Sequence, residues 1–135
     1  MGQSGVILID THVVVWLAFH QDRLSRKARE AIEEARRQEE GLAISDITLL
    51  ELSTLASRGR LHLNMTFESF LQEVESRFVV LPITAGACAR ILELPASYPK
   101  DPADRIIGAT ALITGSKLVT ADGKIRRSRV VNTIW

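Results

Sequence analysis

Short apolar runs alternate with longer amphipathic segments along the chain. The runs are rich in β-branched side chains and bounded by polar, Gly or Pro residues, which is typical of buried strands. They cover residues 6–9, 42–44, 78–81, 117–120 and 130–134.

The segments between these runs carry apolar residues at helical spacing. A helix that starts after Ser25 and continues to about residue 40 would place Ala28, Ile32 and Ala35 on its inner face, and Gly41 would end it. Thr66 is the predicted cap of another helix. Further helices are predicted over residues 46–58, 84–94 and 102–113.

Strands that alternate with helices favour a mainly parallel sheet covered on both faces, because parallel strands need crossover connections. We therefore predict an α/β fold: a three-layer α/β/α sandwich around a roughly five-stranded sheet, in a single domain spanning residues 1–135. Apolar residues make up 46% of the chain, enough for such a core without disulfides. The lone Cys88 is interpreted as a small hydrophobe in a helix.

The overall charge of +1 excludes a strongly basic protein, so any surface for nucleic acid must be local. The longest apolar run, residues 13–19, is far shorter than the roughly 20 residues of a membrane span. The first residues do not form a signal-peptide pattern. We expect a cytoplasmic protein that does not insert in a membrane.

Four carboxylates stand at equivalent places in this pattern. Asp10 follows the first strand, Glu51 lies in the helix after the second, Asp104 begins the helix at 102, and Asp122 follows the fourth strand. Ligands collect where parallel strands end and the next helices begin, so these acids are expected to converge on one sheet edge.

Each acid also has a structural interpretation. Asp10 would cap a helix beginning near His12, and Glu51 would complete a capping box with Thr48. Asp104 would favour a helix start, and Asp122 with the glycine after it would form a turn.

Convergence itself is harder to explain structurally. Two carboxylates about 4 Å apart repel by roughly 4 kcal/mol at an effective dielectric near 20. Divalent Mg²⁺ or Mn²⁺ removes that cost, and a pair of such ions supports phosphodiester hydrolysis without a covalent nucleophile. The chain has no G-x-S-x-G motif. The histidines, which we interpret as structural or exposed, lack the spacing of a helical zinc pair; they are His12, His20 and His62.

The same residues resemble a known family. Ile9-Asp10-Thr11, Leu50-Glu51-Leu52, the D-P-A-D-R-I-I-G-A-T-A stretch at 101–111 and Thr120-Ala121-Asp122 resemble, in order, the PIN domain of VapC-type toxins. The resemblance implies an endoribonuclease that uses Mg²⁺ or Mn²⁺, forms a homodimer and is held inactive by a cognate antitoxin. It also implies that the catalytic, metal-binding residues are Asp10, Glu51, Asp104 and Asp122.

Other residues near these motifs have two interpretations each. Asp101 would support the metal site or cap a helix, while Thr11 and Thr120 would orient a carboxylate or satisfy backbone. Arg105 would bind RNA phosphate or form an ion pair. Residues 117–135, including Lys124, hold five basic residues and one acid, a net +4, and form a plausible phosphate track.

Competing functions find less support in the sequence. A receiver-like domain would need a phosphoacceptor after the run at 78–81, where Pro82 stands. An aspartyl-phosphate phosphatase would need an acid two positions after Asp10, where His12 stands. A catalytically silent PIN-like scaffold or protein-interaction module remains the alternative.

Overall fold

The computed structural model describes residues 6–38 and 41–135, and it contains a five-stranded parallel sheet. The strand order is β3-β2-β1-β4-β5, and every pairing is parallel. The strands are β1 (Ile7–Ile9), β2 (Leu42–Ser45), β3 (Val79–Leu81), β4 (Lys117–Val119) and β5 (Thr133–Ile134). All five predicted runs therefore contain a strand, although β5 is shorter than predicted.

Helices connect the strands, and their caps follow the sequence signals. The α-helices are α1 (Thr11–Phe19), α2 (Arg26–Arg37), α3 (Asp46–Ser57), α4 (Phe67–Arg77), α5 (Ala85–Ile91), α6 (Pro102–Thr114) and α7 (Gly123–Ser128). Ser25 and Thr66 cap α2 and α4 as predicted, since each hydroxyl accepts a backbone N–H from the first turn. The predicted end of the α2 segment, residues 39–40, lies outside the described residues.

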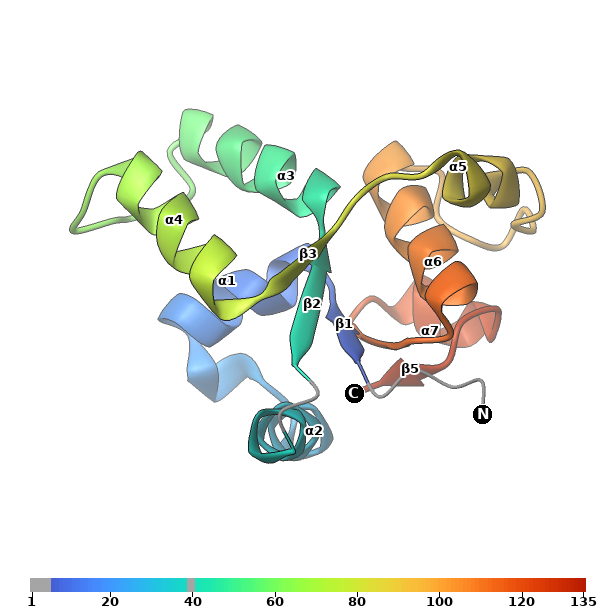
Figure 1. The fold of residues 1–135 in the computed structure, drawn as a ribbon, viewed down its shortest axis with the longest axis horizontal. Coiled ribbons are helices and arrows are strands. Elements are labelled where there is room, and N and C mark those ends of the chain that lie inside the picture. The colour runs from blue at the N-terminus through green and yellow to red at the C-terminus, as the bar shows by residue number, and fades with distance from the viewer. Residues whose placement is uncertain (1–5, 39–40) are drawn as a thin grey trace.

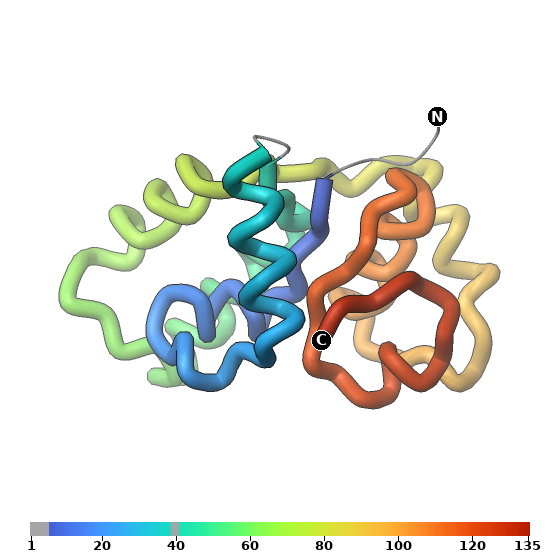
Figure 2. Tube along the Cα trace, turned by 90° about the horizontal axis from the view of Figure 1, so that it is seen from below, coloured from blue at the N-terminus to red at the C-terminus, as the bar shows by residue number. Residues whose placement is uncertain are grey.

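The sheet separates two apolar cores. Ile9, Ile44 and Val119 pack on one face with side chains of α1, α2, α3 and α4. The alternate positions on the same strands face the opposite way and pack with α5, α6 and α7. Figures 1 and 2 show these two helical layers on opposite sides of the strands. The predicted three-layer α/β/α sandwich is confirmed.

Two helices are absent from the pattern of amphipathic segments in the sequence. The α1 segment is apolar almost throughout, so it shows no helical period, although Val13 and Val14 are fully buried. The predicted turn at Asp122-Gly123 is wrong, because Asp122 caps the short helix α7.

Helix α5 ends at Ile91, before the predicted residue 94, and Cys88 on it is exposed. No helix among residues 6–38 and 41–135 has both the length and the apolar character of a membrane span.

Candidate metal centre

Four acidic side chains share one cavity at the carboxyl edge of the sheet. A cavity of about 580 Å³ is lined by Asp10, Glu51, Asp101 and Asp104. Asp122 does not line it, but its negative charge acts on Asp104. The predicted acids are therefore brought to one region from β1, α3, α6 and the start of α7.

Asp10 is the most constrained of these acids, with only 3% of its surface exposed. Its Oδ1 accepts the backbone N–H of Thr11 at 2.9 Å, and its Oδ2 accepts the hydroxyl of Thr120 at 2.7 Å. The first bond caps α1, and the second joins the end of β1 to the end of β4. The carboxylate is thus held in one orientation by two donors that carry no net charge.

His12 is a third neighbour of Asp10. Its Nε2 accepts the backbone N–H of Ala121 at 2.9 Å, so that nitrogen carries no proton. In the neutral ring the proton then resides on Nδ1, which lies 3.7 Å from Asp10 Oδ2. The sequence indicated only a structural or exposed histidine, but its place two residues after Asp10, within the first turn of α1, makes this contact geometrically accessible.

Glu51 is oriented by threonines. The hydroxyl of Thr11 donates to Glu51 Oε1 and also lies 2.9 Å from the hydroxyl of Thr48. Helix α3 begins at Asp46, with Ser45 as its cap, so the capping-box interpretation of Thr48 and Glu51 is wrong. Burial raises the pKa of Glu51; the Thr11 hydrogen bond lowers it in part, and the nearby aspartates add to the rise.

Asp104 is the acid of the site whose negative charge has the least stabilisation from its surroundings. Burial raises its pKa to about 7, with further contributions from the charges of Asp10, Asp101, Glu51 and Asp122. No hydrogen bond or ion pair from residues 6–38 or 41–135 reaches its carboxylate. A half-buried carboxylate that faces four other acids and accepts no hydrogen bond has nothing to stabilise its ionised form, which is typical of a functional site.

Asp101 and Asp122 both serve as helix caps. Asp101 Oδ2 accepts the backbone N–H of Asp104 at 3.4 Å at the start of α6. Asp122 Oδ1 accepts two backbone N–H groups of α7, from Lys124 at 2.8 Å and Ile125 at 3.1 Å. In each case the other carboxylate oxygen makes no hydrogen bond within the described part of the chain.

The two predicted cationic contacts lie apart from the acids. Arg105 donates to the carbonyl oxygen of Tyr98 at 3.4 Å and forms no ion pair with any described residue. The ion-pair interpretation of Arg105 is therefore wrong. Lys124 lines a different cavity, together with Tyr98 and Arg127.

The sequence did not indicate a role for Tyr98, whose side chain contacts the backbone of Asp104. It is 1% exposed, and its hydroxyl donates to the backbone oxygen of Asp104 at 3.3 Å. Burial, followed by the charges of Asp10 and Asp104, raises its pKa, so the phenol remains a neutral donor. A methyl group at Gly108 would lie 2.2 Å from this hydroxyl, which explains the glycine inside α6. That glycine was the one signal in the sequence for a close approach.

The donor atoms of the clustered acids are of the type that a hard divalent cation prefers, but the described side chains are not yet arranged around one. All of the clustered donors are carboxylate oxygens, the ligands that Mg²⁺ and Mn²⁺ prefer. The charges of the neighbouring acids raise the pKa values of Glu51 and Asp104, a cost that a cation would remove. Within residues 6–38 and 41–135, no three His, Cys, Asp or Glu side chains are already grouped to hold an ion. Mutual repulsion and the helix caps both favour such separation.

Comparison with known proteins identifies the family. A model of the PIN domain matches residues 7–130, nearly the whole chain. This chain belongs to the PIN-domain family. This chain is 38% identical over 131 residues to "Ribonuclease VapC22" of Mycobacterium tuberculosis, and the match covers 96% of this chain and 98% of that relative.

Solved structures agree with the fold of this PIN domain. VapBC2 of Rickettsia felis, bound to a promoter DNA fragment, has a TM-score of 0.71 at 18% identity and covers 95% of this chain and 96% of its own. DNA-bound VapBC of Salmonella typhimurium has a TM-score of 0.69 at 22% identity, with coverage of 98% and 97%. At these identities the likeness establishes the fold alone.

Proposed function

We propose that this PIN domain is a metal-dependent endoribonuclease and the toxin of a toxin–antitoxin pair. The observation that carries the proposal is the Asp104 carboxylate, which has no donor among the described residues and lies among acids from three other elements at one sheet edge. The name of the Mycobacterium tuberculosis relative supports ribonuclease activity as the reaction.

In the proposed site Asp10, Glu51, Asp104 and Asp122 hold Mg²⁺ or Mn²⁺. The bound cation would lower the pKa of a water molecule and neutralise charge on the phosphodiester. The chain's own part is positioning: Thr11 and Thr120 fix the ligand oxygens of Glu51 and Asp10.

Asp101 would contribute to the metal site indirectly. Its free oxygen would support the site through a water, while its other oxygen caps α6.

Cleavage of a panel of structured RNAs, with Mg²⁺, with Mn²⁺ and with EDTA, tests the activity. We expect Asp10→Asn to lower cleavage by at least about a hundredfold. Asp22→Asn is the matched control, since Asp22 is exposed on a short 3₁₀ helix and does not line the acidic cavity. If the wild type cuts no RNA and calorimetry detects no binding of either ion, the silent scaffold or interaction module becomes the better explanation.

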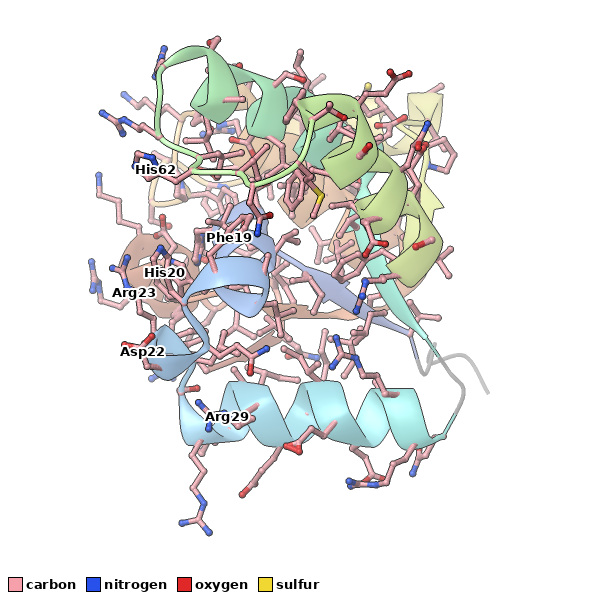
Figure 3. All side chains as sticks on the ribbon, turned by 90° about the vertical axis from the view of Figure 1, so that its left-hand side faces the viewer. Phe19, His20, Asp22, Arg23, Arg29 and His62 are labelled. Atoms are coloured by element: carbon pink, nitrogen blue, oxygen red, sulfur yellow. The ribbon has the colours of Figure 1, made fainter. Side chains whose placement is uncertain are left out.

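A cognate antitoxin is the proposed protein partner. The Rickettsia and Salmonella neighbours are VapBC complexes, which supports this. A cavity of about 330 Å³ between α1 and α4 is lined mainly by apolar side chains, including Phe19 and Met65; Arg77 in its wall is paired with Glu73, whereas Arg36 forms no ion pair with a described residue. Figure 3 shows Phe19 on this face, followed by His20, Asp22 and Arg23 along the turn toward α2. An antitoxin segment with apolar residues and an acidic residue opposite Arg36 would fit it.

A homodimer is the proposed assembly. Large apolar side chains remain exposed in the described residues, among them Leu92 after α5 at 89% and Leu50 on α3 at 61%. Exposed apolar area of this kind is typical of protein interfaces. We also propose that residues 1–135 act as a single PIN domain and that a toxin acting on cellular RNA works in the cytoplasm.

A further inference from the structure

A second cavity lies next to the acidic site and has the opposite charge. It has a volume of about 550 Å³ and is formed by the loop at residues 96–100 and by α7. Its charged lining consists of Lys100, Lys124 and Arg127, with no acidic residue among the described residues that line it. We call it the Lys100 cavity.

Two contacts connect the Lys100 cavity to the acids. Tyr98 lines it and also donates its hydroxyl to the backbone oxygen of Asp104. The backbone N–H of Lys124 donates to Asp122 Oδ1 at 2.8 Å. The loop that forms the cavity therefore contacts the start of α6, which carries Asp104, and the helix that completes the cavity, α7, begins at Asp122.

The three cations of the Lys100 cavity are not neutralised by the protein. None of them forms an ion pair within residues 6–38 and 41–135. Elsewhere on the molecule, arginines are paired with neighbouring glutamates, as in Arg26–Glu30 and Arg77–Glu73. Three like charges around one concavity favour a bound anion.

Gly123 gives the arginine its place. A methyl group at position 123 would lie 2.7 Å from Arg127 Nη1, so the guanidinium rests against the bare backbone next to Asp122. Arg127 is exposed, and the absence of a side chain at position 123 lets its guanidinium lie close to the start of α7.

We propose that the Lys100 cavity binds a backbone phosphate of the RNA other than the one that is cleaved, and so sets the position of the strand over the acidic site. This inference rests on the proposed ribonuclease function. The inference differs from the phosphate track predicted over residues 117–135, because Arg126 and Arg129 do not line the cavity, whereas Lys100 joins it from the loop at residues 96–100.

RNA binding without cleavage tests the proposal. In the Asp10→Asn background with EDTA, the affinity for a single-stranded oligoribonucleotide is measured by fluorescence anisotropy at several salt concentrations. We expect Lys100→Ala with Arg127→Ala to weaken binding about tenfold and to reduce the salt slope by about 0.7 for each RNA phosphate that the protein no longer neutralises. Lys117→Ala with Arg126→Ala removes the same charge from exposed positions outside the cavity and should change affinity less than about twofold.

A phosphate scan identifies the contact itself. Oligoribonucleotides that carry one uncharged methylphosphonate at successive positions are bound to the parent protein and to the Lys100→Ala, Arg127→Ala variant. We expect one position at which the methylphosphonate weakens binding to the parent but not to the variant, because the partner charges are already gone. Gly123→Ala, which displaces the Arg127 guanidinium and keeps its charge, should reduce the penalty at that same position.

Wild-type cleavage is measured alongside with Mg²⁺ and Mn²⁺. Equal loss of affinity in the cavity variant and the control variant, or penalties that add at every position, would overturn the inference while leaving the ribonuclease function in place. If the wild type neither cleaves nor binds any RNA, the proposed function fails and the inference with it.

Discussion

Replacing Asp104 by asparagine tests whether the acidic cluster stores electrostatic repulsion. The pKa of Asp104 rises from 3.8 to about 7 in the folded protein. A group whose pKa is raised on folding contributes stability that is complete below its unfolded pKa and is lost as the pH rises through the folded value. The metal-free wild type should therefore lose stability between about pH 4 and pH 7, whereas the amide of the Asp104→Asn variant does not ionise.

The size of the effect follows from the change in pKa. A rise from 3.8 to about 7 corresponds to at most about 4 kcal/mol, and solvent screening of this half-buried carboxylate reduces that to about 1–2 kcal/mol. The free energy of unfolding of both proteins is measured by urea denaturation in EDTA at about pH 4.5 and at about pH 8. We expect the stability of Asp104→Asn relative to wild type to be about 1–2 kcal/mol greater at the higher pH than at the lower one. Mg²⁺ should stabilise the wild type and narrow the difference at the higher pH.

A pH-independent difference between the two proteins would refute this reasoning, since it would indicate a packing effect of the amide. A variant less stable than wild type near pH 8 would contradict it more directly.

Three further changes probe the support of the site and the assembly. Thr120→Val leaves Asp10 Oδ2 without its hydroxyl donor, so we expect a loss of roughly 1–2 kcal/mol in unfolding free energy and a larger relative loss of RNA cleavage, measured at a temperature where both proteins are folded. Gly108→Ala places a methyl 2.2 Å from the Tyr98 hydroxyl and should cost about 1–3 kcal/mol, which Tyr98→Ala in the same chain should partly relieve; an unchanged melting temperature would contradict the contact. Leu92→Glu should convert a dimer to a monomer in light scattering, and a variant that remains dimeric would exclude that surface.

The placement of the acids was predictable because it depends on chain order. Asp10 directly follows a β-branched apolar run, and Asp104 falls in the first turn of a helix opened by Pro102. Once the strands are parallel, such positions meet at one edge whatever the details of packing. The two helices that the apolar pattern did not predict have local causes: α1 has no polar face, and α7 is only 6 residues long.

The contacts that hold the acids were not predictable in the same way. The hydroxyl of Thr120 reaches Asp10 across 110 residues of chain, and His12 accepts the N–H of Ala121 across 109. Threonine and histidine occur commonly as surface or capping residues, so only the pairing of β1 with β4 reveals these partners. For Asp101 the sequence offered a cap or a metal support, and the cap is the interaction now visible.

The distribution of charge around the site supports a division of work between its two cavities. Asp10 and Glu51 accept hydrogen bonds from hydroxyls and a backbone amide, none of which carries a net charge. Arg58 lines the acidic cavity, yet no Lys or Arg in the described residues forms an ion pair with the clustered acids. A paired lysine or arginine would compete with a divalent cation, whereas neutral donors orient a carboxylate and leave its charge available. Lys100, Lys124 and Arg127 line the separate Lys100 cavity, so the proposed metal and phosphate would each be attracted without neutralising the groups that bind the other.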